Sequence, residues 1–469
     1  MVFTDFKFTK LFGILLLLLY FEPNICSAKN KKPNILFVFM DDLGWKDLGC
    51  YGNNFIETPV ADNLADEGMK FTQAYASPVS SPTRASIITG QNSARHGMWE
   101  VKGVNDRPYA RMQSPKLVRE LNGEINSYAD ILNKEGYVCG HIGKWHVGNS
   151  PQDFGFSKID HNIEDPELSA YAQENDFKGL GSITANSIEF IRKNQDNPFM
   201  LCVSHHFVHA GLEAREDLIS KYETKLRKAG ITDIHPTYAA MVEMGDEALE
   251  MLLNELKALG LENNTVIFFY SDNGGLIRDM YLKKPTPMAT NMHPLRGQKG
   301  GLYEGGIRVP LIVKWPGKVE PGTVCNEMVN SFDLFSTFID IGGGKVLEKQ
   351  EIDGISLVPL LTQNKKSLER NTLYWHFPTN MWTRDPMGAI RKGRYKLIED
   401  YKDGSIELYD LQDDIGESIN LVNKKPEKAR ELLNALKSWR KSVGAKMPTL
   451  NPDYDPVRAD ELGYHRFLR

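Results

Sequence analysis

The chain has 469 residues, of which 41% are hydrophobic, 25% charged and 10% aromatic. This length is too great for one small core, so we expect one large α/β unit and a smaller second domain. The composition is ordinary for a soluble globular enzyme. The formal net charge of −5 is small for a chain of this size, so a nucleic-acid partner gains no support.

The N-terminus, residues 1–28, predicts an export signal. Two lysines precede an apolar run at residues 11–21, and small residues ending at Ala28 offer a cleavage site. The run has about 11 residues, fewer than the ~20 that a membrane span needs, so we expect no stable membrane insertion. A periplasmic protein is expected, and secretion is an alternative. Cys26 leaves a lipoprotein open, although the residues before it match a lipobox poorly.

Strands and helices are expected to alternate over most of the chain that follows. Strands are expected at residues 34–40, 69–75, 137–142, 199–204, 265–270 and 309–314, and helices at 59–67, 127–135, 183–194 and 238–259. The run at 34–40 is continuously apolar, which suits a strand buried on both faces of a parallel sheet, and 265–270 and 309–314 are expected to be buried strands as well. The pattern predicts an α/β fold with a large, mostly parallel sheet sandwiched by helices.

The alternation stops near residue 365, which divides a first domain, 29–365, from a second, 366–469. Short strands are expected at residues 372–376, 389–390, 395–399 and 407–409, followed by an amphipathic helix from Pro426 to about Val443. These elements predict a smaller C-terminal α+β domain with an antiparallel sheet. The tail from Pro448 is expected to lack regular structure.

One stretch in the first domain combines a helix start with a possible anion site. Ser80-Ser81-Pro82-Thr83-Arg84 has the form S-x-P-x-R and leads into an apolar helical turn. Pro82 suits the first turn of a helix, so we expect Ser80 near unpaired backbone N–H groups that favour an anion. Arg84 lies one helical turn further and can lean back over Ser80. An ordinary helix cap is the alternative interpretation.

Acidic side chains follow two of the expected strands. Asp41 and Asp42 follow the first strand, and Asp272 and Asn273 follow the strand at residues 265–270. Open α/β sheets place their sites at these strand ends. Three carboxylates and an amide oxygen suit Ca²⁺ or Mg²⁺, and without a cation the carboxylates would raise one another's pKa. An Asp pair after a strand also fits a turn or a cap.

Basic side chains follow other strands. Lys144 and His146 are two residues apart, so an extended chain would project both to one side. His209 follows another strand, and Lys299 lies in a glycine-rich segment whose backbone can approach a ligand closely. Cations beside a divalent metal form a site for phosphate or sulfate. Each motif alone also fits a structural role.

Taken in chain order, these motifs resemble those of the type I sulfatases, which belong to the alkaline phosphatase superfamily. The resemblance rests on Asp41-Asp42-Leu43-Gly44, Ser80 to Arg84 with Thr89-Gly90, Gly143 to Gly148, His209, Ser271 to Gly275, and Lys299 with Tyr303 to Arg308. Segments at residues 394–398, 408–411, 416–417 and 420–421 resemble the C-terminal domain of that family. The resemblance implies an alkaline phosphatase-like fold and hydrolysis of sulfate esters.

The same resemblance implies two cofactors. Ser80 would be oxidised after translation to Cα-formylglycine (3-oxoalanine), whose hydrated aldehyde is the nucleophile. One Ca²⁺ would be held by Asp41, Asp42, Asp272, Asn273 and the modified residue at position 80. Because this position is Ser and not Cys, a radical-type maturase is expected as a partner, and the source is expected to be bacterial.

Roles for the basic residues also follow from the resemblance. Arg84 and Lys144 would steady the nucleophile, and Lys299 would bind a sulfate oxygen. His209 would protonate the departing sugar oxygen, and His146 would later take a proton from the second hydroxyl.

Candidate substrate contacts are side chains suited to sugar stacking, hydroxyl bonding or a second sulfate. They are Arg95, His96, Trp99, Arg278, His293, His376, Trp382 and Arg384. We expect a sulfated oligosaccharide or polysaccharide, with an algal polymer such as ulvan or carrageenan preferred to a glycosaminoglycan. The rival hypotheses are a phosphoester or phosphonate hydrolase of the same superfamily, and a non-catalytic glycan-binding protein in which Ser80 is unmodified.

Overall fold

The computed structural model describes residues 32–101, 107–121, 125–159, 162–277, 289–381 and 384–461. These residues all belong to one compact unit. The expected export signal, Arg278 and Trp382 lie outside the described residues. Within the described ranges, every helix is too short or too polar to cross a membrane. The four cysteines in these ranges are free thiols.

The centre of the structure is an eight-stranded sheet in the order β4-β5-β1-β6-β7-β2-β8, with β9 paired to β2. Its strands are β1 (Asn34–Met40), β2 (Met69–Tyr75), β4 (Val138–Gly143), β5 (Phe199–Ser204), β6 (Thr265–Ser271), β7 (Arg308–Lys314), β8 (Thr323–Cys325) and β9 (Val329–Asn330). β4, β5, β1 and β6 are parallel, whereas β7 runs antiparallel to β6 and β2. The expected mostly parallel sheet is confirmed. The direction of β7 could not be read from its sequence, because a strand buried on both faces is apolar in either direction.

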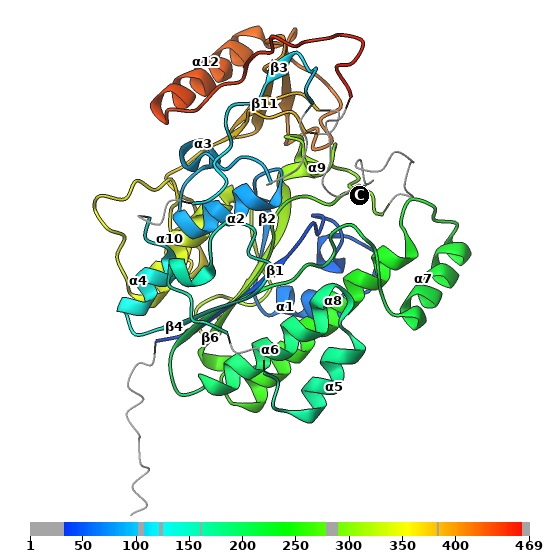
Figure 1. Ribbon diagram of the computed structural model, residues 1–469, viewed down its shortest axis with the longest axis vertical. Helices are drawn as coiled ribbons and strands as arrows, with labels where there is room; N and C mark the ends of the chain where they lie inside the picture. The colour runs from blue at the N-terminus through cyan, green and yellow to red at the C-terminus, as the bar shows by residue number, and fades with distance from the viewer. Residues whose placement is uncertain are drawn as a thin grey trace, which may run out of the picture. The chain divides into compact units, whose positions relative to one another are not determined.

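Helices cover both faces of this sheet (Figure 1). The α-helices around it are α1 (Pro59–Asp66), α2 (Ser80–Thr89), α3 (Ser93–His96), α4 (Tyr128–Lys134), α5 (Pro166–Glu174), α6 (Leu180–Lys193), α7 (Glu216–Ala229), α8 (Pro236–Ala258), α9 (Glu304–Ile307), α10 (Ser331–Gly342) and α11 (Val358–Leu361). Alternate residues of β1 enter different cores. Leu36 and Val38 pack with α1, α6 and α8, whereas Ile35 and Phe37 pack with α2, α4 and α10. This alternation makes the sheet the middle layer of a sandwich.

A second sheet is formed by the C-terminal part of the chain. It is antiparallel and contains β10 (Thr372–Phe377), β11 (Met387–Lys392), β12 (Tyr395–Asp400) and β13 (Ile406–Asp410). Helix α12 (Pro426–Ser442) packs Leu432 and Leu436 onto Ile390 and Leu397 of this sheet. The expected antiparallel meander is confirmed, and the domain boundary at residue 365 stays a prediction.

The tail contains one regular element, contrary to expectation. β14 (Thr449–Leu450) pairs with β3 (Met112–Gln113), more than 300 residues earlier in the chain. A pairing of two residues leaves no periodic pattern in the sequence, because it depends on a distant strand and not on local preference.

A buried ion cluster joins the second sheet to the rest of the molecule. Lys396 Nζ on β12 lies 2.8 Å from Glu304 Oε1 on α9 and 2.9 Å from Glu417 Oε1. All three side chains are 0% exposed. Burial raises the pKa of Glu417, whereas Lys396 and Arg308 outweigh burial and lower the pKa of Glu304. We refer to Lys396, Glu304 and Glu417 as the buried triad.

Buried histidines are expected to make stability depend on pH. Burial lowers the pKa of His205 to about 3 and that of His376 to about 4, from an ordinary value of 6.5. Below pH 6.5 the unfolded chain therefore binds more protons than the folded chain, and stability falls as the pH falls towards 4. His205 is a clean test, because neither of its ring nitrogens has a hydrogen-bond partner among the described residues.

Between pH 7 and pH 5, the free energy of unfolding should fall by about 2 kcal/mol less in His205→Phe than in the wild type. Urea unfolding of both proteins at both pH values measures this difference. Any repacking cost of the larger ring is the same at each pH and cancels. A variant that loses as much stability as the wild type over this interval would contradict the assignment.

Candidate active site

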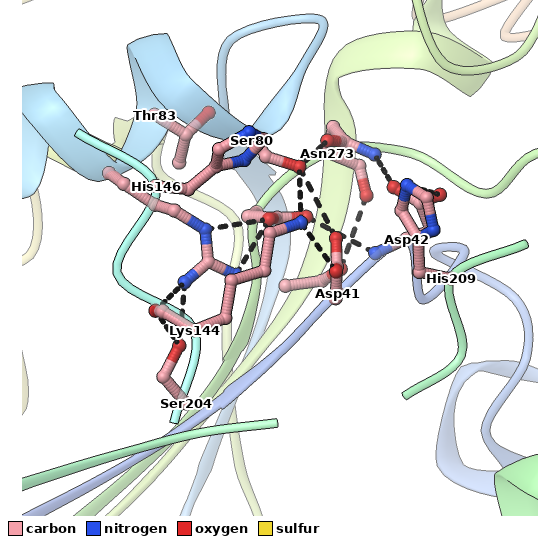
Figure 2. Close-up of polar contacts among 12 residues, drawn as sticks. Asp41, Asp42, Ser80, Thr83, Lys144, His146, Ser204, His209 and Asn273 are labelled. Carbon is pink, nitrogen blue, oxygen red and sulfur yellow. Dashed lines mark hydrogen bonds and ion pairs between the residues drawn. The ribbon is translucent and has the colours of Figure 1, made fainter. Parts of the chain in front are cut away.

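Four neighbouring strands of the large sheet end at one place and bring polar side chains together. Asp41 follows β1, Lys144 follows β4, Ser204 ends β5 and Asp272 follows β6. Because these strands are parallel and adjacent, their carboxyl ends share one edge of the sheet. Figure 2 shows the side chains converging on Ser80, at the start of α2.

The Ser80 hydroxyl lies at the centre of this cluster and is 1% exposed. Its Oγ is 3.2 Å from Asp41 Oδ1 and 3.3 Å from Asn273 Oδ1, either of which can accept its hydrogen. Lys144 Nζ donates to Ser80 Oγ over 3.3 Å. Val79 occupies the N-cap position, so Ser80 is the first helical residue and not the cap. The helix start thus aims Ser80 at the carboxylates.

Arg84 forms a buried ion pair instead of leaning over Ser80 as expected. Its Nε and Nη2 donate to Asp272 Oδ2 over 3.1 and 2.8 Å. Its Nη1 donates to the Lys144 carbonyl and to Ser204 Oγ over 2.8 and 2.6 Å. No hydrogen bond joins Arg84 to Ser80 in the structure. A buried carboxylate is a stronger partner for a guanidinium than a hydroxyl is, so Arg84 positions Asp272 and the Lys144 backbone.

A second group of contacts forms around Asp42. Lys299 Nζ donates to both Asp42 carboxylate oxygens over 2.6 and 2.8 Å, and Asn273 Nδ2 donates to Asp42 Oδ1 over 2.7 Å. His209 Nε2 lies 3.8 Å from Asp42 Oδ2. The loop before His209 is held by a backbone hydrogen bond from Val208 to the Asp41 carbonyl over 2.6 Å. The structure thus brings His209 and Lys299 to the Asp pair, as the sequence predicts.

The donor set at this place fits a divalent cation. Asp41, Asp42 and His209 each offer one ligand atom, and these atoms lie within 4.8 Å of one another. The carboxylates are buried, and the cations beside them are the Nζ atoms of Lys144 and Lys299. Carboxylate oxygens suit Ca²⁺ or Mg²⁺. Asp272, also predicted as a ligand, directs Oδ2 to Arg84 and accepts the Asp42 backbone N–H on Oδ1, so its role as a ligand stays a prediction.

The two central carboxylates have opposite pKa shifts. Burial alone would raise the pKa of Asp41, but Lys144, followed by His209 and Lys299, lowers it well below the ordinary value. Burial and the neighbouring Asp41 charge raise the pKa of Asp272 to about 6. The fixed charges therefore keep Asp41 ionised at neutral pH, as a metal ligand must be.

The loop after β4 has a backbone that few residues could adopt. Gly143 has φ 101°, and a Cβ there would lie 2.1 Å from the Ser204 carbonyl oxygen. His146 has φ 62°, so the chain is not extended there and the expected alternation with Lys144 does not apply. Ser81 Oγ donates to the His146 carbonyl over 2.8 Å. Desolvation, followed by the charges of Lys144 and Arg84, lowers the pKa of His146.

Five of the predicted substrate contacts are buried or have partners within the fold. Arg95 pairs with Asp353 and Glu351, and the ring of His96 is buried against Ser86 and Met98. His376 contacts Tyr401 and the Lys446 carbonyl, and Trp99 is 1% exposed. His293 is exposed, and Arg384 donates to the Gln298 carbonyl beside Lys299. A substrate role for these residues stays a prediction.

Ser204 was missed by the sequence analysis. Its hydroxyl accepts from Arg84 and donates to the Lys144 carbonyl, so it joins β5 to the loop after β4. Ser204 could have been found from its position as the last residue of a predicted strand, because the other site residues were selected from the ends of predicted strands.

Residues 33–344 match the sulfatase family, and residues 298–442 match the C-terminal region of N-sulphoglucosamine sulphohydrolase. A protein named sulfatase from Formosa agariphila is 31% identical, and the alignment covers 92% of this chain and 93% of that protein. The chain belongs to the sulfatase family. The predicted enzyme class, sulfuric ester hydrolase, is confirmed.

Other sulfatases are similar along most of their length. The N-acetylgalactosamine-6-sulfatase of Rattus norvegicus is 30% identical over 79% of this chain and 72% of its own. The solved structure of Ps i-CgsB in complex with k-i-k-neocarrahexaose is 24% identical, with a TM-score of 0.71 and coverage of 91% of this sulfatase and 96% of that chain. The structural likeness confirms the predicted alkaline phosphatase-like fold.

Proposed function

We propose that this sulfatase removes sulfate groups from a sulfated carbohydrate, using Ser80 matured to Cα-formylglycine and one Ca²⁺. The observation that carries the proposal is the convergence of Asp41, Asn273 and Lys144 on the buried Ser80 Oγ. A serine placed among fixed charges at the end of a sheet is suited to covalent catalysis. Maturation by a radical-type maturase and a periplasmic location belong to the same proposal.

Asp41, Asp42 and Asn273 would hold the cation, with Asp272 as a further ligand. A bound divalent cation supplies positive charge that lowers the pKa of a neighbouring hydroxyl and stabilises charge on the sulfate oxygens. The formyl group supplies a hydrated aldehyde as the nucleophile at position 80.

The chain's own cations hold the reacting groups in place. Lys144 Nζ lies 2.5 Å from Asp41 Oδ2 and also donates to Ser80 Oγ, so it would orient the nucleophile formed at residue 80. Lys299 Nζ lies against Asp42 and is the nearest cation on that side for a sulfate oxygen. Both lysines belong to sites that are almost closed to solvent, where charge stabilisation is strong.

His209 is suited to pass a proton to the departing sugar oxygen. Its Nδ1 is 3.2 Å from the Ala210 carbonyl, an acceptor, so Nδ1 carries a hydrogen. Nε2 consequently faces the Asp42 side of the site and is the atom at which the proton would move. His146, on the loop after β4, would accept the proton of the second hydroxyl when sulfate leaves.

The substrate class is supported by the similar proteins. One acts on N-acetylgalactosamine-6-sulfate by name, and another was solved with a neocarrahexaose. We prefer an algal polysaccharide of the carrageenan or ulvan type, and a glycosaminoglycan is the alternative. The rival activity, phosphoester hydrolysis, would use the same oxyanion chemistry.

The proposal is tested with natively matured protein and a pair of aryl esters, one sulfate and one phosphate. Sulfate release should dominate, and the peptide containing Ser80 should be about 2 Da lighter than the serine form, because oxidation removes two hydrogens. Dominant phosphate release would establish the phosphoester hydrolase instead. An unmodified Ser80 together with full sulfatase turnover would refute the formylglycine mechanism.

Removal of the cation is expected to abolish turnover and lower stability. Asp41 and Asp42 are buried side by side, so a bound Ca²⁺ relieves their repulsion and stabilises the folded state by about 2.7 kcal/mol at a hundredfold excess over Kd. Treatment with EGTA followed by readdition of Ca²⁺ should lower and then restore both the melting temperature and sulfate release. Mg²⁺ readdition is the matched control for the choice of ion. Unchanged turnover and melting temperature in EGTA would rule the metal site out.

A further inference from the structure

A second cleft lies away from the Ser80 cluster, where the β2 side of the large sheet meets the C-terminal sheet. Its volume is about 690 Å³, and its walls come from β2, the start of β7, the β8–β9 segment and the turns beside β11 and β13. Four arginines line it, Arg308, Arg370, Arg391 and Arg394. Glu327 is the only acidic residue among its lining residues. None of the residues proposed for catalysis or metal binding lines this cleft.

Among the described residues, Arg391 forms no direct ion pair, although it is one of the cations, after Lys396 and Arg308, that lower the pKa of Glu304. The residue is 6% exposed, and its guanidinium donates to the Tyr75 hydroxyl, the Gln73 side-chain oxygen and the Gly393 carbonyl. All three acceptors are neutral. A guanidinium held this far from water without a direct counter-ion favours binding of an anion from outside.

The carboxylate partners of two other arginines lie behind the cleft wall. Arg308 Nη1 is 3.3 Å from Glu304 Oε2, and Arg370 Nη2 is 2.5 Å from Asp333 Oδ2. Both carboxylates are 0% exposed, and neither lines the cleft. The counter-ions of Arg308 and Arg370 therefore lie away from the cleft, whereas Arg394 pairs with Asp410 Oδ1 over 2.5 Å and with the exposed Asp413. The cleft thus offers a ligand the guanidinium groups of Arg308, Arg370 and Arg391.

The remaining lining residues indicate what kind of anion fits. Four carboxamide side chains also line the cleft, those of Gln73, Asn326, Asn371 and Gln412. Carboxamides both donate to and accept from hydroxyl groups, and arginine forks match sulfate oxygens. Among the described residues that line the cleft, none is aromatic, so binding to them would depend on charge and hydrogen bonds and not on stacking.

We propose that this arginine cleft binds a sulfated segment of the carbohydrate chain, apart from the sulfate presented to Ser80. The proposal rests on the proposed substrate class. Such a site would raise affinity for a chain carrying several sulfates and leave a small aryl sulfate unaffected, because none of the residues that contact Ser80 lines the cleft. Phosphate shares the oxyanion chemistry and is separated from sulfate by the experiment.

Two exposed carboxamides allow the cleft to be tested without removing a buried arginine. The double variant Asn371→Asp with Gln412→Glu adds two negative charges at the rim and nearly preserves side-chain volume. Asn371 Oδ1 accepts from Thr372 Oγ1 over 2.8 Å, and an aspartate oxygen can accept the same bond. The matched control is Gln173→Glu with Gln195→Glu, which adds the same charge at exposed positions outside the cleft lining.

Binding is measured by calorimetry with a sulfated carrageenan hexasaccharide and full-length protein carrying Ser80→Ala, so that no ester is hydrolysed. The rim variant should bind the hexasaccharide about tenfold more weakly, because each added carboxylate opposes the sulfates, and the control should change affinity less than about twofold. In matured enzyme with Ser80 intact, both variants should hydrolyse an aryl sulfate at the wild-type rate.

Equal weakening by the two double variants, or no weakening by either, would overturn the proposal. Displacement of the hexasaccharide by inorganic phosphate at concentrations where inorganic sulfate has no effect would overturn the preference for sulfate. If the wild type releases no sulfate from any carbohydrate, the proposed function fails. The calorimetric comparison still decides whether the cleft binds a sulfated chain.

Discussion

Replacing Ser80 by alanine is expected to lower sulfate release by roughly 10⁴-fold or more, because removal of a nucleophile typically has this effect. The Ser80 Oγ is the only hydroxyl in contact with Asp41, Asn273 and Lys144 together among the described residues. No other side chain there could take its place. Initial rates with an aryl sulfate, measured on protein made in the native host, give the comparison.

Ser81→Ala is the matched control for this variant. Ser81 is the next residue of α2 and is similarly buried, and its hydroxyl bonds to the backbone carbonyl of His146, not to its ring or to Asp41, Asn273 or Lys144. Its loss should cost about 1 kcal/mol of stability and leave most turnover in place. If Ser80→Ala retained turnover comparable with Ser81→Ala, covalent catalysis at position 80 would be refuted.

Replacing Asp272 by alanine is expected to destabilise the protein by about 3–5 kcal/mol and to abolish turnover and Ca²⁺ binding together. The carboxylate is fully buried and pairs with Arg84 over 2.8 Å, so its removal leaves a buried guanidinium without its counter-ion. It also accepts the Asp42 backbone N–H, which holds the Asp pair in place. Urea unfolding, calcium titration and sulfate release measure the three effects.

A double variant that removes both charges separates the ion pair from the other roles of Asp272. In Asp272→Leu with Arg84→Met both charges are removed, so stability should recover by several kcal/mol relative to Asp272→Ala. Turnover and Ca²⁺ binding should stay lost in the double variant. Recovery of turnover along with stability would mean that Asp272 acts only through folding.

Much of the fold could be predicted from the chain because its buried strands are locally distinct. The run Asn34–Met40 is apolar throughout and is buried throughout, so its bounds could be read without any knowledge of its neighbours. The helices α5, α7 and α10 were not predicted. In α7 the apolar positions Leu218, Tyr222 and Leu226 form a narrow stripe between charged residues, which marks a helix only when its partner helix α8 is known.

The candidate site shows the same limit at the level of side chains. The rule that sites lie at strand ends selected Asp41, Lys144 and Asp272 correctly as neighbours. It could not assign partners among them, because the pairing of Arg84 with Asp272 depends on the register of β6 against β1. Nor could it detect the positive φ of His146, since that conformation is uncommon even for histidine.

The buried triad has a consequence for engineering new specificity. Exchanging the C-terminal sheet between related sulfatases is one route to chimaeras with other substrates. Lys396 would then be supplied by the donor, whereas Glu304 would remain in the recipient, only five residues after Lys299. A chimaera without a lysine at this place would leave the buried Glu304 with Arg308 as its remaining ion-pair partner, close to the segment that carries Lys299. A sulfatase that can supply the C-terminal sheet can thus be chosen by whether it has a lysine at the position of Lys396, before any activity is measured.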